Sequence, residues 1–152
     1  MAQVKKWKSA RRTATPHNRQ EHETHPKGWV LLVDDEELVT EVGREMLACL
    51  GYATVVQTSS HGALEVFREA PQRFRLVMTD LNMPGMNGEL LASHLWDIRP
   101  DIPIILCTGS NEMTQRKAQL RGFDALLTKP FVVKDVAQAI EHALTQRTAQ
   151  KM

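Results

Sequence analysis

Aromatic side chains, cysteines and long apolar runs are all scarce in this sequence. Phe, Trp and Tyr make up only 5% of the 152 residues, so the core must be built mainly from aliphatic side chains. No run approaches the roughly 18 apolar residues of a transmembrane helix, and the basic N-terminus lacks the apolar segment of a signal peptide. We therefore expect a cytoplasmic protein that is not inserted in a membrane.

The two cysteines, Cys49 and Cys107, are far apart and lie within apolar stretches. They form no C-x-x-C pair, and no group of His and Cys residues has the spacing of a zinc site. We interpret them as buried free thiols in a reducing compartment. The sequence also has neither a P-loop nor a G-x-G-x-x-G motif, which argues against a nucleotide-binding domain.

Charge is distributed unevenly along the chain. Residues 1–28 contain seven Lys/Arg and two Asp/Glu, whereas residues 29–152 contain twelve and sixteen. The first segment is polar and has no helical or strand periodicity, which predicts a disordered basic arm. Trp7 among its lysines leaves contact with nucleic acid or an anionic surface open as an alternative to a solvated tail or a linker.

From residue 29 onward, short apolar runs alternate with segments of helical periodicity. The short runs predict buried strands at 29–33, 53–57, 75–79, 102–107 and 125–128. Apolar side chains at helical spacing predict helices at 36–50, 60–70 (with Ser59 or Ser60 as its cap), 88–98, 111–121 and 133–146. This alternation predicts an α/β protein with a flavodoxin-like (βα)5 fold, in which a doubly wound, five-stranded parallel sheet has the order 2-1-3-4-5.

Polar side chains follow four of the five predicted strands. They are Asp34 and Asp35 after the first strand, Asp80 after the third, Thr108 after the fourth and Lys129 after the fifth. Each could have an ordinary structural role, such as capping a helix. Because ligands bind at the carboxyl ends of parallel strands in such sheets, their coincidence at four strand ends favours a functional site.

The chemistry of this site follows from its charge. Three clustered carboxylates repel one another unless a cation neutralises them, and oxygen donors without His or Cys favour Mg²⁺. Asp34 and Asp35 are adjacent and suited to hold the metal, whereas Asp80 stands alone and is predicted to attack a phosphoryl group. The resulting acyl phosphate would be labile, and its added charge could be sensed by the Thr108 hydroxyl.

Four motifs in this order resemble the receiver domain of two-component response regulators, over about residues 29–146. They are VDDE at 33–36, MTDLNMPGMNG at 78–88, CTGS at 107–110 and TKPF at 128–131. The resemblance implies phosphorelay signalling, in which a sensor histidine kinase or a phosphotransfer protein donates a phosphoryl group. It also implies that the domain is not otherwise an enzyme and catalyses only its own Mg²⁺-dependent phosphorylation and dephosphorylation.

The resemblance implies a role for each site residue. Asp80 matches the phosphoacceptor, Thr108 the switch hydroxyl and Lys129 the lysine that binds the phosphate. The Mg²⁺ ligands would be Asp34, Asp35 (the closer of the pair), Asp80 and the backbone carbonyl of Asn82. In the family, the peptide bond between this lysine and the following proline is usually cis.

One position departs from the family pattern. An aromatic residue often stands three positions before the lysine, and here that residue is Leu126. The coupling between Thr108 and the output surface is therefore expected to differ. Output to an unknown downstream protein is expected through the face formed by the fourth helix, the fifth strand and the fifth helix, with homodimer formation as an open alternative.

Two further interpretations stay open. Residues 147–152 are predicted to be a short tail with no DNA-binding domain, and parts of the motifs resemble receivers of hybrid sensor kinases, so that the basic arm could be a linker. Alternatively, the domain could be a pseudo-receiver that takes no phosphate, although no acidic, Thr or Lys position is lost. A haloacid-dehalogenase-type phosphatase is disfavoured because its nucleophile belongs to a D-x-D pattern, whereas Asp34 and Asp35 are adjacent.

Overall fold

Five parallel strands form one sheet in the computed structural model, which describes residues 27–151. The strands are β1 (Trp29–Val33), β2 (Ala53–Gln57), β3 (Phe74–Asp80), β4 (Ile104–Thr108) and β5 (Ala125–Thr128). Their order is β2-β1-β3-β4-β5, so the predicted fold class is confirmed. Most of the predicted basic arm, residues 1–26, lies outside the described part of the chain.

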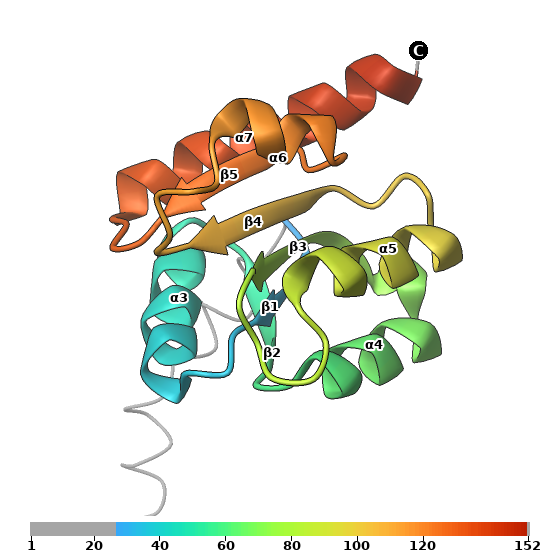
Figure 1. Cartoon of the computed structure of the whole chain (residues 1–152), viewed down its shortest axis with the longest axis horizontal. Coiled ribbons are helices and arrows are strands. Elements are labelled where there is room, and N and C mark those ends of the chain that lie inside the picture. Colours follow the sequence, from blue (N-terminus) through green and yellow to red (C-terminus); the bar gives the residue numbers. More distant parts are fainter. Residues whose placement is uncertain (1–26, 152) are drawn as a thin grey trace, which may run out of the picture.

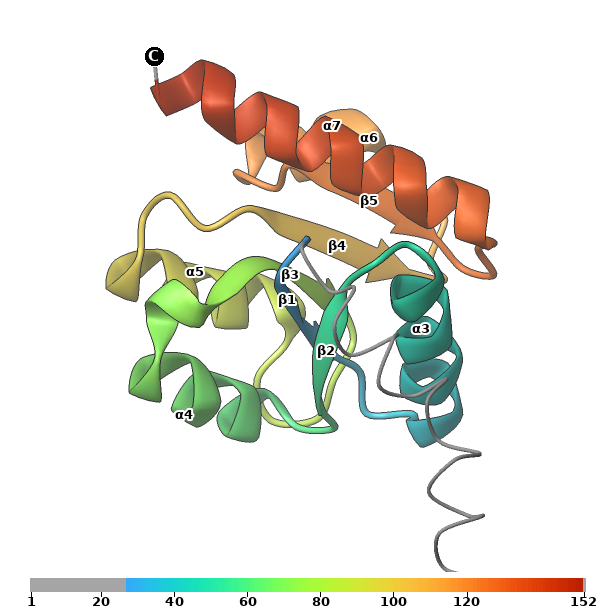
Figure 2. The same ribbon diagram turned by 180° about the vertical axis from the view of Figure 1, so that it is seen from behind.

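Helices cover both faces of the sheet (Figures 1 and 2). They are α3 (Glu37–Cys49), α4 (Ser60–Glu69), α5 (Gly88–Ile98), α6 (Gln115–Leu120) and α7 (Val133–Lys151), with a short 3₁₀ turn at Pro71–Arg73. Buried side chains of α3 and α7 pack on one face, and those of α4, α5 and α6 pack on the other. Within residues 27–151, no helix combines the length and apolar character that crossing a bilayer requires.

Strand β1 shows why the sheet needs both helical layers. Val30 and Leu32 point into the cluster shared with α3 and α7, while Leu31 and Val33 point into the cluster shared with α4 and α5. All four side chains are at most 4% exposed. Burial of each contributes roughly 1.5–3 kcal/mol, so the strand is held firmly from both sides and its end is a rigid support.

Local capping determines where several elements begin and end. The Ser59 hydroxyl accepts a hydrogen bond from the Gly62 N–H (3.0 Å) and caps α4, which settles the choice between the two serines. Gly51, with φ of 93°, follows the end of α3 as expected. The Thr114 hydroxyl accepts from the Lys117 N–H (3.2 Å), so α6 starts after it rather than near residue 111.

The start of β4 and the environment of one cysteine also differ from the sequence prediction. Strand β4 begins at Ile104 rather than at residue 102, because Pro103 has no N–H to donate to the sheet. Cys107 is buried within β4 as predicted. The prediction of a buried thiol at Cys49 is wrong, because this residue ends α3 on the exposed side of the helix.

The last helix continues past the predicted end at residue 146 and reaches Lys151. Arg147 anchors this extension through three contacts. Its Nε lies 2.8 Å from a carboxylate oxygen of Asp124, and its two terminal nitrogens donate to the carbonyls of Pro100 and Gly122 (both 3.2 Å). These contacts join α7 to segments that are distant in sequence, which helical periodicity alone could not indicate.

The first residue of α5, Gly88, is packed against the end of β3. A Cβ added to Gly88 would lie 2.2 Å from the backbone carbonyl oxygen of Asp80, whereas a Cβ on Gly109 would have no neighbour within 4 Å. We expect Gly88→Ala to lower the free energy of unfolding by about 1–3 kcal/mol, measured by urea denaturation. Gly109→Ala, the matched control, should change it by less than about 0.5 kcal/mol. Equal losses for the two variants would contradict this close packing.

Candidate functional site

Three carboxylates meet at the carboxyl ends of the neighbouring strands β1 and β3. Asp34 and Asp35 follow β1, and Asp80 is the last residue of β3. Val33 lies opposite Thr79 in the sheet, so the two strands end level with each other. One oxygen from each of the three aspartates lies within 4.8 Å of the others. The structure thus brings together the three acidic residues that the sequence predicted at this edge.

Lys129 reaches the same site from the end of β5. Its Nζ lies 2.7 Å from Oδ2 of Asp34 and 3.3 Å from Oδ1 of Asp80. Its backbone N–H donates to the Thr108 carbonyl (2.9 Å), and the peptide bond between Lys129 and Pro130 is cis. The lysine therefore bridges two aspartates and is closer to Asp34 than to Asp80.

The three carboxylates differ in environment. Asp34 and Asp80 are 2% and 6% exposed, while Asp35 is exposed to solvent. Asp34 also accepts a hydrogen bond from the Glu36 N–H (3.0 Å). In Asp80, the Leu81 N–H (2.9 Å) and Lys129 both contact Oδ1, and Oδ2 accepts no hydrogen bond from the described residues. One oxygen of Asp80 is thus fixed, and the other is left for a further partner.

Burial and nearby charges shift the pKa values of Asp80 and Lys129 in this site. Burial raises the pKa of Asp80 above its ordinary value, and the nearby charge of Asp34 raises it further, against the opposing effects of Lys129 and the Leu81 N–H. Burial alone would lower the pKa of Lys129, but the hydrogen bond to Asp34 and the charges of both aspartates more than offset this and raise it. Lys129 is therefore a cation at neutral pH.

This donor set fits a hard divalent cation. When all three aspartates are ionised, the Lys129 ammonium neutralises only one of the three negative charges, and two of the carboxylates are shielded from water. Clustered oxygen ligands with a negative charge left over are the environment that Mg²⁺ prefers in proteins. The raised pKa of Asp80 agrees with this, because the carboxylate is buried and lies beside the charge of Asp34, and Lys129 does not fully offset these two effects.

The other residues singled out in the sequence lie at the end of β4, in the loop after β3 and within β5. Thr108 ends β4, next to β3; its side chain is fully buried, and its hydroxyl accepts from the Ser110 N–H (3.0 Å). Asn82 is exposed and lines a cavity of about 240 Å³. Leu126, at the position of the usual aromatic residue, is already packed in the core at 7% exposure.

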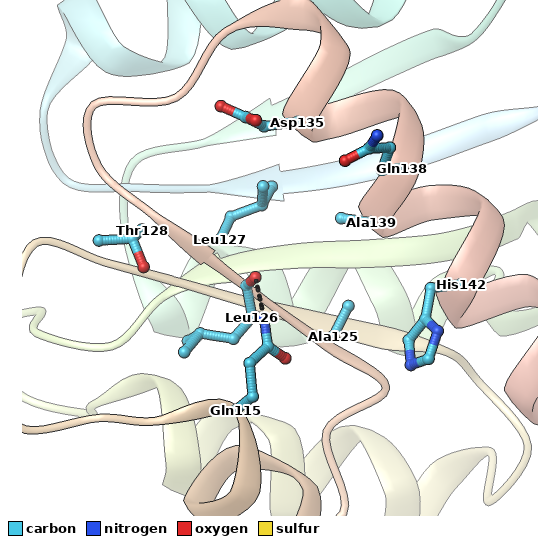
Figure 3. Close-up of a pocket in the computed structure, with 9 residues that line it drawn as sticks. All are labelled: Gln115, Ala125, Leu126, Leu127, Thr128, Asp135, Gln138, Ala139 and His142. Carbon is cyan, nitrogen blue, oxygen red and sulfur yellow. Dashed lines mark hydrogen bonds between the residues drawn. The ribbon is translucent and has the colours of Figure 1, made fainter.

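A hollow of about 480 Å³ lies on the face formed by α6, β5 and α7, which the sequence analysis assigned to output (Figure 3). It is lined by Gln115, Ala125, Leu126, Leu127, Thr128, Asp135, Gln138, Ala139 and His142. The side-chain amide of Gln115 donates to the Leu126 carbonyl (3.1 Å), as the dashed line in Figure 3 shows. This bond links α6 to β5, three residues before Lys129.

Sequence reasoning missed the tertiary contacts of the buried residues Ser60 and Asp124. The Ser60 hydroxyl donates to the Met86 carbonyl in the loop after Asp80, and the Asp124 carboxylate accepts from the Ile104 N–H (2.8 Å) as well as pairing with Arg147. Neither residue belongs to a spaced motif or ends a strand. The only sequence signal was the pair Ser59 and Ser60: one serine is enough to cap α4, which leaves the other hydroxyl available for a different contact.

The raised pKa of Asp80 generates a stability prediction. A pKa above that of the unfolded chain means that protonation favours the folded state; this stabilisation is present at low pH and is lost as the pH rises through the raised pKa. At neutral pH without divalent cations, Asp80→Asn should therefore raise the melting temperature above that of the wild type, and the gain should shrink on acidification. Asp97→Asn, at an exposed position of α5, should leave it nearly unchanged. A lower melting temperature for Asp80→Asn would contradict this account.

Comparison with known proteins places the chain in a family. The model of the response regulator receiver domain matches residues 30–141. The transcriptional regulator NtrC of Azospirillum brasilense is 33% identical over 120 residues, which cover 78% of this chain and 24% of that protein. The sensor kinase CckA of Brucella abortus is 31% identical over 119 residues, 78% of this chain and 13% of that protein. The chain thus spans a quarter or less of these two relatives.

A solved structure agrees with the sequence comparisons. The receiver domain protein from Clostridium thermocellum superposes with a TM-score of 0.74 and 25% identity, covering 81% of this chain and 98% of that one. The chain therefore belongs to the response regulator receiver domain family, the signal-receiving module of two-component phosphorelays.

Proposed function

We propose that the chain accepts a phosphoryl group on Asp80 from a phosphohistidine of a sensor histidine kinase or a phosphotransfer protein. The observation that supports this role most strongly is the asymmetry of the Asp80 carboxylate. Lys129 and the Leu81 N–H hold Oδ1, while Oδ2 has no hydrogen-bond donor among the described residues. A fixed carboxylate with one available oxygen at a rigid strand end is suited to nucleophilic attack.

The proposed metal site uses the carboxylates of Asp34, Asp35 and Asp80 and the backbone carbonyl of Asn82. A bound Mg²⁺ would neutralise charge on the phosphoryl oxygens during transfer. Asp34 is held in place by Lys129 and by the Glu36 N–H. Asp35, which is exposed, is the ligand that an ion arriving from solvent would meet first.

In the proposed transfer, Oδ2 of Asp80 attacks phosphorus. A P–O bond forms, the P–N bond to the donor imidazole breaks, and its electron pair leaves with the imidazole nitrogen. The Lys129 ammonium, 3.3 Å from Oδ1, is positioned to bind a phosphoryl oxygen as charge develops there. Because Asp80 is 6% exposed, water has little access to the reacting carboxylate.

The product would carry more negative charge than the free carboxylate. Thr108 lies on the strand beside β3, and its hydroxyl now serves as acceptor for the Ser110 N–H. The hydroxyl keeps its own hydrogen while it accepts this bond, so it is able to donate to a phosphoryl oxygen, and movement of Thr108 toward that oxygen would shift the loop at Ser110. Leu126 is already buried, so we propose that the change reaches the hollow between β5 and α7 through the Gln115 bond rather than through an aromatic side chain. A downstream protein or a second copy of the chain would bind there.

The donor protein has a suitable surface beside the site. A groove of about 480 Å³ runs between α3 and the segment after β5, and it is lined by Glu36, Leu38, Val39, Val42, Met46, Lys129, Pro130 and Phe131. Leu38 is 76% exposed and Val42 49%. Since Lys129 belongs to both the groove and the carboxylate site, a helix seated on these apolar side chains would lie next to Asp80.

The nucleophile is tested with a small phosphodonor. Wild-type protein incubated with acetyl phosphate and Mg²⁺ should gain one phosphoryl group by intact-mass measurement, and Asp80→Asn should gain none because an amide cannot form the acyl phosphate. Asp97→Asn, remote from the site, should react like the wild type. Equal modification of Asp80→Asn would rule out Asp80 as nucleophile. Failure of the wild type to react would favour the pseudo-receiver alternative.

The metal site is tested by thermal unfolding. A ligand that binds only the folded state stabilises it by about 2.7 kcal/mol at one hundred times its dissociation constant, so Mg²⁺ should raise the melting temperature. Asp35→Ala should abolish this rise, whereas Glu37→Ala, an exposed acidic position in the first turn of α3, should preserve it. An undiminished rise in Asp35→Ala would remove Asp35 from the metal site.

A further inference from the structure

The loop formed by residues 81–87 joins β3 to α5 and carries Asn82. Ser60, the first residue of α4, contacts this loop although it is distant in sequence. Its hydroxyl donates to the Met86 carbonyl (2.5 Å) and lies 3.7 Å from the sulfur of Met83. Ser60 is 1% exposed, and Ser59 already caps α4. The Ser60 hydroxyl is therefore not needed to start its own helix, and its contacts are made to the loop.

The two ends of the loop are secured by other bonds. The Leu81 N–H donates to the Cys107 carbonyl (3.1 Å) as well as to Asp80, and the Gly88 N–H donates to the Leu81 carbonyl (2.8 Å). Among the described residues, Ser60 is the one side chain from another element that hydrogen-bonds to residues 83–86. The middle of the loop is thus tied to the rest of the protein by this hydroxyl, together with the packing of Met83 and Met86 in the core.

We propose that Ser60 is a positioning residue for the Mg²⁺ site, acting through the backbone of Asn82. Asn82 lies between Leu81, which is bonded to β3 and β4, and Met83, which is buried against Ser60. With both neighbours held, the direction of the Asn82 carbonyl is fixed before any ion binds. The inference rests on the proposed Mg²⁺ site and names a residue that controls it from outside the ligand set.

The physical reason is that a backbone carbonyl has no rotamer of its own. Its orientation depends entirely on the loop that carries it, so loosening the loop misdirects the ligand. Replacing Ser60 by Ala would leave the carbonyl of the buried residue Met86 without its partner, and the loop would have to rearrange to satisfy it. Loss of a partner outside the ligand set commonly weakens metal binding about 10–100-fold. Since one of four proposed ligands is affected, we expect a loss of roughly tenfold.

The test compares Ser60→Ala with Ser59→Ala. Each removes one hydroxyl from the start of α4, but the Ser59 hydroxyl, among residues 27–151, bonds the Gly62 N–H of its own helix and no other group. Titration calorimetry with MgCl₂ should show roughly tenfold weaker binding for Ser60→Ala and unchanged binding for Ser59→Ala. In metal-free protein, hydrogen exchange at the Gly88 amide should accelerate in Ser60→Ala alone, because the loop it closes is loosened.

The outcomes separate this inference from the proposed function. Mg²⁺ binding that is equally tight in the wild type and Ser60→Ala overturns the inference and leaves the proposed function intact, as does an equal loss in Ser59→Ala, which would indicate a general effect of α4 stability. A wild type that binds no Mg²⁺ overturns both. Ser60→Cys keeps the size of the side chain but offers only a weak donor. Ser60→Cys should also bind Mg²⁺ more weakly than the wild type. If Ser60→Ala does not fold, the affinity of Ser60→Cys for Mg²⁺ tests the inference in its place, and unchanged affinity overturns it.

Discussion

The mutual repulsion of three carboxylates held at one edge of a sheet is the constraint on which the site depends. Asp34 and Asp80 are almost fully buried, and Asp35 completes the cluster from the solvent side. Lys129 supplies one positive charge to this group. The unbalanced charge creates the demand for a cation, and it adds to burial, the main cause, in raising the pKa of Asp80. It also makes the site sensitive to any further charge placed on Asp80.

The rest of the fold resists this repulsion. Strand β1 is buried on both faces, so its end cannot move away from the end of β3 without disturbing two packed clusters. The loop after Asp80 is folded tightly back on β3 at Gly88 and is held from α4 by Ser60. Lys129 is joined to β4 through Thr108. A change of charge at Asp80 would therefore act on a stiff framework.

The sheet and the candidate site were predictable from the sequence because local patterns marked the strands and the polar residues at their ends. Apolar runs marked the five strands, and the topology of parallel sheets implied that Asp80 and Lys129 would meet although 49 positions separate them. Features set by tertiary contacts were not predictable. The continuation of α7 past residue 146 is accompanied by the contacts of Arg147 with distant segments. The exposure of Cys49 depends on which side of α3 faces the sheet. The shorter distance of Lys129 to Asp34 than to Asp80 depends on side-chain geometry.

The central claim is that Asp80 carries the phosphoryl group, and chemical mapping of the modified residue tests it most directly. An acyl phosphate on an aspartate is reduced by borohydride to homoserine, which peptide mass spectrometry can locate after treatment with acetyl phosphate and Mg²⁺. The account predicts homoserine at position 80, formed only when Mg²⁺ is present. Homoserine at position 34 or 35 instead, or formation at position 80 that is equally efficient in EDTA, would contradict it.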